Sequence, residues 1–307
     1  MIYLGSVNLG KGEDMGMKGK VVVVTGATNG IGLVVARELA RLGARVFGVC
    51  RDSERCSRAE TMIRQETQNQ QVEYLCADLS LVEQVRLLAA DIRARTGQLH
   101  VLVNNAGAYF ARRQTTSEGL EKTFALNHLN YFLLTHLLLD LLKASGSAQD
   151  PARIVNVASD AQRGGKLDEK VLLAQGKYKG FQAYASSKLC NVVFTYELSR
   201  RLADDPVNVN VMHPGYVATN FALDNFSGKA KPVRSLYRKV SRLFARSPEQ
   251  GADTAIWLAN SLETAFETGQ YWFDRTAIRS QAISYDWEAA RRLWELSERL
   301  CGLQEAL

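Results

Sequence analysis

The sequence predicts an α/β fold, a single doubly wound domain with a seven-stranded parallel sheet flanked by helices. Short runs of β-branched and apolar residues alternate with segments in which apolar residues recur at helical spacing. Strands separated by helices of this length imply right-handed crossover connections and therefore a parallel sheet. A chain of 307 residues with 46% hydrophobic content is also large enough to bury one sizeable core.

The expected elements follow one another along the chain without an internal repeat. We expect strands at residues 21–24, 45–50, 72–76, 101–103, 154–157, 207–212 and 270–273. We expect helices at residues 31–42, 53–68, 117–143, 181–202, 248–260 and 286–300, with a further helix that follows residues 78–80 and ends near residue 95. Residues 1–17 should form a flexible N-terminal extension, residues 18–307 the single domain, and residues 216–247 a mobile excursion within it.

The stretch from Val21 to Gly32 contains the clearest candidate for ligand binding. Four valines predict a strand buried on both faces, and the glycines after it permit a tight turn. A helix is expected to begin near Gly30, so its free N–H groups and positive dipole end would face a pyrophosphate. The spacing Gly-x-x-x-Gly-x-Gly differs from the Gly-x-Gly-x-x-Gly fingerprint of dinucleotide sites. A glycine-rich turn in an unrelated α/β protein is therefore an alternative.

Charge and composition limit the classes of partner. The formal charge of +6 and the pI near 9.0 suit an anionic partner, such as a phosphorylated cofactor or an acidic membrane surface. We expect no nucleic-acid partner, because the sequence has no recognition module and no basic run interleaved with stacking aromatics. Residues 1–19 contain no apolar run of signal-peptide or membrane-span length, which favours a cytoplasmic protein.

The cysteines and histidines are scattered along the chain. No Cys-x-x-Cys pair occurs, and the histidines form no cluster with the spacing of metal ligands. We therefore expect no metal and no disulfide framework, a pattern that suits a reducing compartment. The five cysteines are Cys50, Cys56, Cys76, Cys190 and Cys301.

Polar residues that suit acid–base chemistry are expected at one edge of the sheet. Tyr184 and Lys188 are spaced at i and i+4 on one expected helix, so their side chains face the same way. A free tyrosine has a pKa of roughly 10, and a nearby ammonium would lower it by favouring the phenolate. Two snorkelling, half-exposed side chains are the alternative. Ser159 follows the fifth expected strand, residues 104–107 follow the fourth, and Asn127 lies in an expected helix where asparagine needs a partner.

Several motifs occur in a fixed order from about Lys18 to Phe273. They are Thr25-Gly26-x-x-x-Gly30-x-Gly32, Asn104-Asn105-Ala106-Gly107, Asn127, Ser159, Tyr184-x-x-x-Lys188 and Pro214-Gly215. In this order the set resembles the classical short-chain dehydrogenase/reductase family. The resemblance implies that residues 18–307 form a Rossmann-type NAD(P)-binding catalytic domain.

The finer resemblance is to the retinol dehydrogenase-like branch of that family. It is carried by the stretches 127–135, 154–159 and 293–297, by Cys50-Arg51-Asp52, and by the long gap between Ser159 and Tyr184. The sequence departs from the branch at Ala158, where serine is frequent, and we expect no N-terminal membrane anchor such as many animal members carry, because residues 1–19 contain no long apolar run.

The resemblance also implies roles for individual residues. Tyr184 would give a proton to the substrate oxygen in reduction and remove one in oxidation, and Ser159 would hydrogen-bond that oxygen. Lys188 would lower the pKa of Tyr184 and hold the nicotinamide ribose, and Asn127 would hold a water linking Lys188 to solvent. Besides Tyr184 and Lys188, the cofactor would contact Gly26, Thr28, Asn29, Gly30, Ile31, Gly32, Arg51, Asp78, Leu79, Asn105, Ala106, Gly107, Pro214, Gly215, Val217 and Thr219.

The end of the second expected strand predicts NADP(H) rather than NAD(H) as the cofactor. A carboxylate at that position would accept hydrogen bonds from a ribose 2′-hydroxyl and repel a 2′-phosphate. This chain has the uncharged Cys50 there, followed by the guanidinium of Arg51, which suits a phosphate. Asp52 argues mildly for NAD(H) unless it caps the following helix.

Two functions from different classes are compatible with these residues. The first is an NADP(H)-dependent oxidoreductase that acts on a hydrophobic aldehyde, ketone or alcohol of the retinal/retinol type, with Ser159 and Phe221 as substrate contacts. Here the resemblance makes residues 216–247 a substrate lid whose basic residues could touch an anionic membrane, a solvated helix face being the alternative. The second is a catalytically silent dinucleotide-binding redox sensor or interaction protein. A homodimer or tetramer is compatible with the family.

Overall fold

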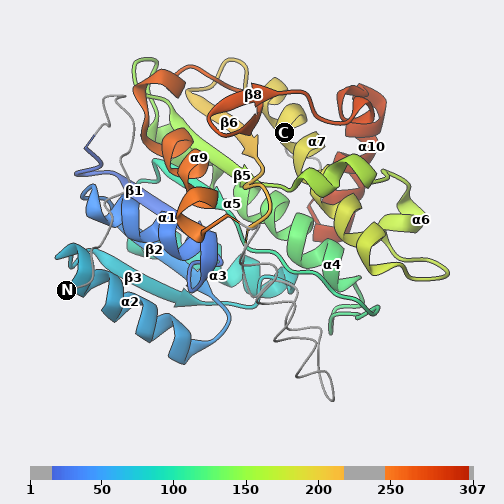
Figure 1. The fold of residues 1–307 in the computed structure, drawn as a ribbon, viewed down its shortest axis with the longest axis horizontal. Helices are drawn as coiled ribbons and strands as arrows, with labels where there is room; N and C mark the ends of the chain where they lie inside the picture. The colour runs from blue at the N-terminus through green and yellow to red at the C-terminus, as the bar shows by residue number, and fades with distance from the viewer. Residues whose placement is uncertain (1–15, 218–245, 304–307) are drawn as a thin grey trace.

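The fold is built on one sheet between two layers of helices (Figure 1). The computed structural model describes residues 16–217 and 246–303. Within these residues the sheet has eight strands in the order β3-β2-β1-β4-β5-β6-β7-β8. The strands are β1 Val21–Thr25, β2 Arg45–Cys50, β3 Val72–Cys76, β4 Val101–Asn104, β5 Ala152–Val157, β6 Val207–Met212, β7 Tyr271–Phe273 and β8 Thr276–Ile278. The predicted doubly wound α/β fold is confirmed, and the order of the strands reverses direction between β1 and β4.

Alternate residues of β1 face the two helical layers. Val22 and Val24 belong to a core shared with the first layer, and Val21 and Val23 to a core shared with the second. The first layer contains α1 Gly30–Arg41, α2 Ser53–Thr67 and α9 Pro248–Asn260; the second contains α3 Val82–Arg95, α5 Asn130–Ser145, α7 Gly180–Arg201 and α10 Trp287–Cys301. Two short helices, α4 Lys122–Phe124 and α6 Glu169–Leu172, lie in the connections before α5 and α7.

The eighth strand is the main departure from the predicted seven-stranded parallel sheet. Neighbouring strands from β3 to β7 are parallel, but β8 pairs with β7 in the antiparallel direction. Asp274 and Arg275 form the two-residue turn between them with φ values of 48° and 58°. Such left-handed turns usually contain Asn or Gly, which this turn lacks. Two hydrogen bonds of 2.8 and 2.6 Å from the Arg275 guanidinium to Asp253 on α9 support it instead.

The helix expected at residues 117–143 begins later and is interrupted. Glu121 accepts a hydrogen bond of 2.7 Å from the backbone N–H of Phe124 and so caps α4. Residues 125–129 then form a π-helical turn, which contains Asn127, before α5 begins at Asn130. A π turn inserts one extra residue per turn and is frequent at functional sites.

Two other predictions concern the N-terminal extension, residues 1–17, and the expected lid, residues 216–247. Met17, expected in the flexible extension, is 2% exposed, and its backbone N–H donates to the Leu42 carbonyl at 2.9 Å. Residues 1–15, and residues 218–245 of the expected lid, lie outside the described residues. The two flanks of that segment lie side by side, because Val217 forms a β-bridge with Arg246.

The expectation that the cysteines form no disulfide is wrong for one pair. Cys50 at the end of β2 is bonded to Cys56 in the first turn of α2, with their Cα atoms 6.0 Å apart. Their spacing of six residues matches no common metal or redox motif. The strand-to-helix turn brings the two residues together, which the sequence pattern did not indicate.

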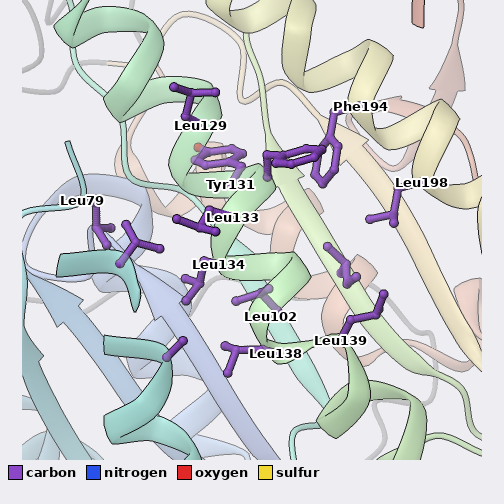
Figure 2. Close-up of a cluster of buried hydrophobic side chains, with 14 of the residues drawn as sticks. Leu79, Leu102, Leu129, Tyr131, Leu133, Leu134, Leu138, Leu139, Phe194 and Leu198 are labelled. Carbon is purple, nitrogen blue, oxygen red and sulfur yellow. The ribbon is translucent and has the colours of Figure 1, made fainter. Parts of the chain in front are cut away.

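Leucines and aromatic residues from β4, α5 and α7 form the centre of the second core (Figure 2). Leu102 on β4 is fully buried, as are Leu134 and Leu138 on α5, and Phe194 and Leu198 on α7 are nearly so. This core fixes α5 and α7 against the sheet, and these two helices carry or adjoin most of the predicted catalytic residues.

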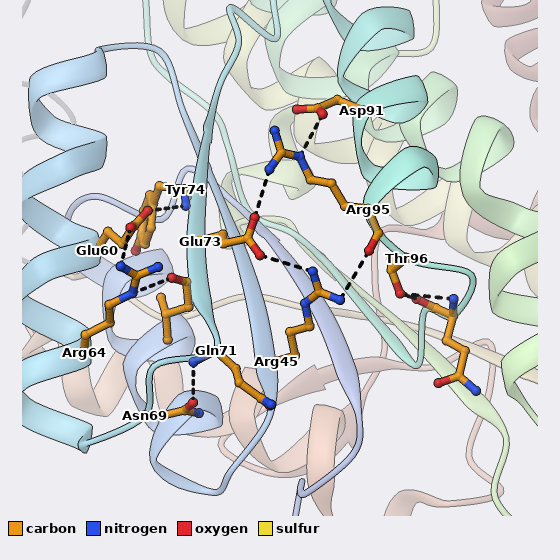
Figure 3. Close-up of polar contacts among 12 residues, drawn as sticks. Arg45, Glu60, Arg64, Asn69, Gln71, Glu73, Tyr74, Asp91, Arg95 and Thr96 are labelled. Carbon is orange, nitrogen blue, oxygen red and sulfur yellow. Dashed lines mark hydrogen bonds and ion pairs between the residues drawn. The ribbon is translucent and has the colours of Figure 1, made fainter.

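A network of polar contacts lies at the edge of the sheet formed by β3 (Figure 3). Glu73 on β3 bonds Arg45 on β2 at 3.1 Å and Arg95 on α3 at 3.0 Å, and Arg95 also bonds Asp91 at 2.7 Å. Because all four side chains are partly solvated, these pairs add little to stability. They join α3 to the edge strand β3 and, through Glu73, to its neighbour β2.

We predict that Leu102→Ala destabilises the fold by about 2–5 kcal/mol, because it leaves a cavity in a fully buried site. The measurement is the free energy of unfolding from urea titration. Leu87→Ala on α3 is the control, since Leu87 is 61% exposed and its truncation should change stability by less than about 0.5 kcal/mol. Equal losses in both variants would contradict this description of the core.

Candidate active site

The glycine turn after β1 is held by one buried hydroxyl. Thr25 Oγ1 accepts hydrogen bonds from the backbone N–H groups of Asn105, at 2.9 Å, and of Ala106, at 3.0 Å. In return the Asn105 side-chain amide donates to the Thr25 carbonyl at 2.8 Å. A Cβ on Gly32 would lie 2.4 Å from both the Gly26 carbonyl oxygen and Asn105 Nδ2, so only glycine fits there. The ends of β1 and β4 are thereby fastened together.

A tyrosine from β3 fixes the same turn from the other side. The Tyr74 hydroxyl donates to the Ala27 carbonyl at 2.7 Å, and its ring fills the space left by the missing side chain of Gly48 on β2. Burial raises the pKa of Tyr74, so the hydroxyl stays a donor at all working pH values. Thr25 stands in the glycine motif, but the sequence predicts no hydrogen-bonding role for it, and Tyr74 has the pattern of an ordinary strand residue.

The turn and the start of α1 fit a dinucleotide pyrophosphate. Asn29 occupies the N-cap position of α1, and its side chain makes no capping hydrogen bond within the described residues. The first N–H groups of the helix are thus left to an external acceptor. Gly26, Thr28, Asn29, Gly30, Ile31 and Gly32 all lie in this stretch, as predicted from the sequence.

The remaining predicted residues gather at the carboxyl edge of the same sheet. Arg51 follows β2, Asp78 and Leu79 follow β3, residues 105–107 follow β4, and Pro214 and Gly215 follow β6. Asp52 caps α2 by accepting a hydrogen bond from the Arg55 N–H at 2.9 Å, which explains this acidic residue beside Arg51. Asp78 Oδ1 accepts from the hydroxyl of Ser80 at 2.7 Å. Thr219 and Phe221 lie outside the described residues.

Asn127 is fully buried in the π turn, and its side chain has several partners. Its Oδ1 accepts from the Ala108 N–H at 2.8 Å, and its Nδ2 donates to the Ala108 carbonyl at 2.9 Å and to Ser187 Oγ at 3.0 Å. Ser187 Oγ in turn donates to the Tyr184 carbonyl at 2.7 Å. Asn127 therefore links the loop after β4 to the helix turn that carries Tyr184.

Ser159, Tyr184 and Lys188 meet beside this loop. The Ser159 and Tyr184 side chains are hydrogen-bonded to each other. Lys188 is 3% exposed, and its Nζ donates to the Val157 carbonyl at 2.8 Å. A Cβ on Gly107 would lie 3.3 Å from Lys188 Nζ and 3.2 Å from Asn127 Oδ1, so both groups lie against the side of Gly107 that a side chain would occupy. The structure thus brings Lys188 and Asn127 together at Gly107, and Ser159 together with Tyr184.

The electrostatics differ from the prediction for Tyr184. Burial raises the pKa of its phenol to about 12, and the hydrogen bond with Ser159 offsets part of this rise. Burial also lowers the pKa of Lys188 to about 7. The expected lowering of the Tyr184 pKa by Lys188 is therefore not found in this structure, because desolvation acts on both groups and leaves the ammonium only partly charged at neutral pH.

His213 belongs to no predicted site, but in the structure it supports the Pro214–Gly215 turn. Its Nδ1 accepts a hydrogen bond from the Gly215 N–H at 3.2 Å. Its ring stacks on Phe273 with 4.3 Å between ring centroids and 7° between planes. Burial lowers the pKa of His213, which keeps Nδ1 available as an acceptor.

Residues 20–230 match the family of short chain dehydrogenases. The protein therefore belongs to the short-chain dehydrogenase family, whose fold binds a nicotinamide dinucleotide, and is an oxidoreductase of the retinol dehydrogenase-like kind.

The relatives include retinol dehydrogenase 13 of Homo sapiens, which is 41% identical over 288 residues, or 93% of this chain and 86% of that protein. Retinol dehydrogenase 14 of Mus musculus is 38% identical over 304 residues, or 96% and 89% of the two chains. A solved structure of an uncharacterized protein from Mycobacterium Paratuberculosis has a TM-score of 0.76, 30% identity and coverage of 96% and 98%. The Pseudomonas aeruginosa RhlG/NADP active-site complex has a TM-score of 0.66, 29% identity and coverage of 83% and 94%.

Two searches of the described residues gave negative results. None of their helices combines the length and the apolar character needed to cross a membrane. Their His, Cys, Asp and Glu side chains form no group of three or more that could hold a metal ion.

We predict that Thr25→Val destabilises the fold by about 1–3 kcal/mol, because the N–H groups of Asn105 and Ala106 lose their buried acceptor. The same variant should bind NADPH more weakly, since the glycine turn loses its attachment to β4. Unfolding in urea and fluorescence titration with NADPH measure the two effects. Thr61→Val, at an exposed position of α2, is the matched control. Wild-type values for Thr25→Val in both measurements would contradict the role given to this hydroxyl.

Proposed function

We propose that the protein is an NADP(H)-dependent oxidoreductase that moves a hydride between nicotinamide and a hydrophobic aldehyde or ketone, or the corresponding alcohol. One observation carries the proposal. The bonded hydroxyls of Ser159 and Tyr184 and the buried ammonium of Lys188 lie beside Gly107, at the sheet edge that also carries the glycine turn. A protein that only bound a dinucleotide would not need this acid–base set.

The choice of NADP(H) is supported by the charge at the end of β2. Cys50 is uncharged and disulfide-bonded, and Arg51 beside it is exposed at the edge where the adenosine ribose is expected. Asp52 is engaged as the cap of α2, so it does not take the place of a ribose-binding carboxylate. A guanidinium in this position suits a 2′-phosphate. A related structure is described as an NADP complex, which agrees with this choice.

The side chains divide the chemistry between them. The nicotinamide supplies or accepts the hydride when it is bound. Tyr184 keeps its proton at neutral pH, because burial raises the pKa of its phenol to about 12, and so can donate it to a carbonyl oxygen during reduction. The Ser159 hydroxyl orients the same oxygen. The charged form of Lys188 stabilises the phenolate that remains on Tyr184, and its ammonium also suits the ribose hydroxyls.

The substrate class is supported by the surroundings of Tyr184 and by the relatives. Tyr109 packs edge-to-face on Tyr184, with 6.2 Å between ring centroids. Phe181 on α7 and Tyr216 after β6 are 63% and 56% exposed. An apolar molecule reaching Tyr184 would find aromatic surface on these elements. Relatives named retinol dehydrogenases make a retinal- or retinol-like compound the first substrate to try.

Assembly and location are also part of the proposal. We expect a cytoplasmic homodimer or tetramer, with peripheral contact to membranes as the route to a lipophilic substrate. Size-exclusion chromatography and sedimentation with lipid vesicles measure these two properties directly.

We predict that Tyr184→Phe lowers kcat for NADPH-dependent aldehyde reduction by about 10²- to 10⁴-fold, because the proton donor is lost. NADPH affinity should stay within about twofold, since the aromatic ring remains. The measurement is the loss of NADPH absorbance with a panel of hydrophobic aldehydes, together with a binding titration. Tyr196→Phe on the same helix is the control, because the Tyr196 hydroxyl bonds Ser280 away from the site. Activity in Tyr184→Phe equal to wild type would remove Tyr184 from the mechanism.

We predict that kcat for reduction falls about tenfold between pH 6 and pH 8, as the ammonium of Lys188 loses its proton. The sign follows from the lowered pKa of about 7, because the charged form that stabilises the phenolate exists below it. Lys188→Arg should be slower but should not show this fall, since a guanidinium stays charged over this range. A wild-type kcat that is constant from pH 6 to pH 9 would contradict the role of the charge.

A further inference from the structure

We propose that Cys50, Cys56 and Cys76 form a thiol–disulfide exchange site whose redox state controls how tightly the chain binds the adenosine end of NADP(H). This inference rests on the proposed function, because it takes Arg51 as the residue that meets the 2′-phosphate. These three of the five cysteines lie together at the carboxyl ends of β2 and β3.

The disulfide encloses the residue that is expected to bind phosphate. Cys50 ends β2 and Cys56 lies in the first turn of α2, so Arg51 and the cap residue Asp52 are inside the ring that the bond closes. The cross-link restricts the backbone that carries the guanidinium of Arg51. A restricted backbone loses less entropy when that side chain becomes ordered on a phosphate, so the oxidised form should bind NADPH more tightly.

Cys76 is a third sulfur beside this ring. It ends β3, pairs in register with Cys50, and is an exposed free cysteine. Its Sγ lies 3.3 Å from the Arg51 carbonyl oxygen. Paired strands are about 4.8 Å apart, which is within the range of Cα separations that a disulfide can bridge. Cys76 can therefore replace Cys56 as the partner of Cys50.

Backbone carbonyl oxygens also lie near both sulfurs of the Cys50–Cys56 disulfide, where they can accept from the reduced thiols. Cys50 Sγ lies 3.1 Å from the Asp52 carbonyl oxygen, and Cys56 Sγ lies 3.7 Å from the Leu75 carbonyl oxygen. Each thiol would have an acceptor in place once the bond is broken. Opening the ring therefore frees Arg51 without leaving the two sulfurs unpartnered.

The exchange is balanced in atoms and electrons. The Cys76 thiolate attacks Cys50 Sγ, the Cys50–Cys76 bond forms as the Cys50–Cys56 bond breaks, and Cys56 leaves as a thiolate that takes up the proton lost by Cys76. A dithiol reductant then opens the new bond in two exchange steps. It passes two electrons and two protons to the protein and becomes a disulfide itself. This route gives access to a bond whose own residues, Cys50 and Cys56, are only 6% and 4% exposed.

The other two cysteines provide the contrast. Cys190 and Cys301 are buried, at 0% and 1% exposure, and burial raises the pKa of the Cys301 thiol to about 12. Such thiols are inert to exchange. Cys301 on α10 is therefore a suitable control position.

The test measures the Kd for NADPH on the full chain, oxidised and after reduction with dithiothreitol, with the cysteine pairing assigned by mass spectrometry. We expect reduction to weaken NADPH binding about three- to tenfold, and NADH binding much less. The double variant Cys56→Ser/Cys76→Ser, in which neither bond to Cys50 can form, should bind NADPH like the reduced wild type under both conditions, whereas Cys301→Ala should keep the wild-type difference. Cys76→Ser should keep the Cys50–Cys56 bond but slow its reduction several-fold. Arg51→Ala should bind weakly and equally in both states.

Each outcome decides one of the claims. Equal NADPH affinity before and after a verified reduction, or no Cys50–Cys56 bond in the oxidised protein, overturns the inference and leaves the proposed function standing. An unchanged reduction rate in Cys76→Ser overturns the exchange route. Failure of both forms to bind either dinucleotide overturns the proposed function and this inference together. If circular dichroism shows that Cys56→Ser/Cys76→Ser does not fold, the comparison of the two wild-type forms decides alone.

Discussion

The hydroxyl of Thr25 makes the interaction on which the rest of the site depends. It accepts two backbone N–H groups from the loop after β4, at 2.9 and 3.0 Å, at the point where the strand order of the sheet reverses. At such a point the loops from neighbouring strands separate and leave room for a ligand. The hydroxyl fixes the position of residues 105–107 relative to the glycine turn that follows Thr25. Without it, the turn that would hold a pyrophosphate would lose two hydrogen bonds to the loop beside Lys188.

The second constraint is the burial of the Lys188 ammonium beside the loop after β4. Lys188 is 3% exposed and bonds the Val157 carbonyl at the end of β5. Burying an ammonium is costly, and that cost appears here as a pKa lowered to about 7. The same desolvation raises the pKa of Tyr184 to about 12. A protein with no use for these groups would gain stability by replacing them, so their position favours a catalytic role.

Much of the fold was predictable because local signals agreed with the global arrangement. The four valines of β1, the alternation of strands and helices, and the ends of α9 and β6 follow from periodicity and turn residues. What could not be predicted depends on contacts distant in sequence. The β7–β8 turn uses Asp274 and Arg275 rather than glycine, and its support comes from Asp253 on another helix.

The candidate site likewise contains residues that the sequence predicted and residues that it did not. The glycine turn, residues 105–107, Ser159 and the Pro214–Gly215 turn each follow the end of a strand, whereas Asn127 lies in a π-helical turn and Tyr184 and Lys188 lie on α7. The sequence predicts no structural role for Thr25, Tyr74 or His213, although Thr25 and the Pro214–Gly215 turn stand in the motifs. The hydrogen-bond partners of Thr25 and Tyr74 lie more than ten residues away, and His213 belongs to no cluster of histidines. The direction of the Tyr184 pKa was also wrong, because i,i+4 spacing reports the neighbouring ammonium but not the burial of both groups. The disulfide of Cys50 and Cys56 depends on how the chain turns from β2 into α2.

The most direct measurement of the central claim follows the hydride itself. The protein would be mixed with NADPH deuterated at the transferable position of the nicotinamide and with a hydrophobic aldehyde such as retinal. The account predicts that deuterium appears on the carbinol carbon of the alcohol product, in step with the NADP⁺ formed. Saturable binding of NADPH with no deuterium in any alcohol, across a broad panel of lipophilic aldehydes and ketones, would contradict it.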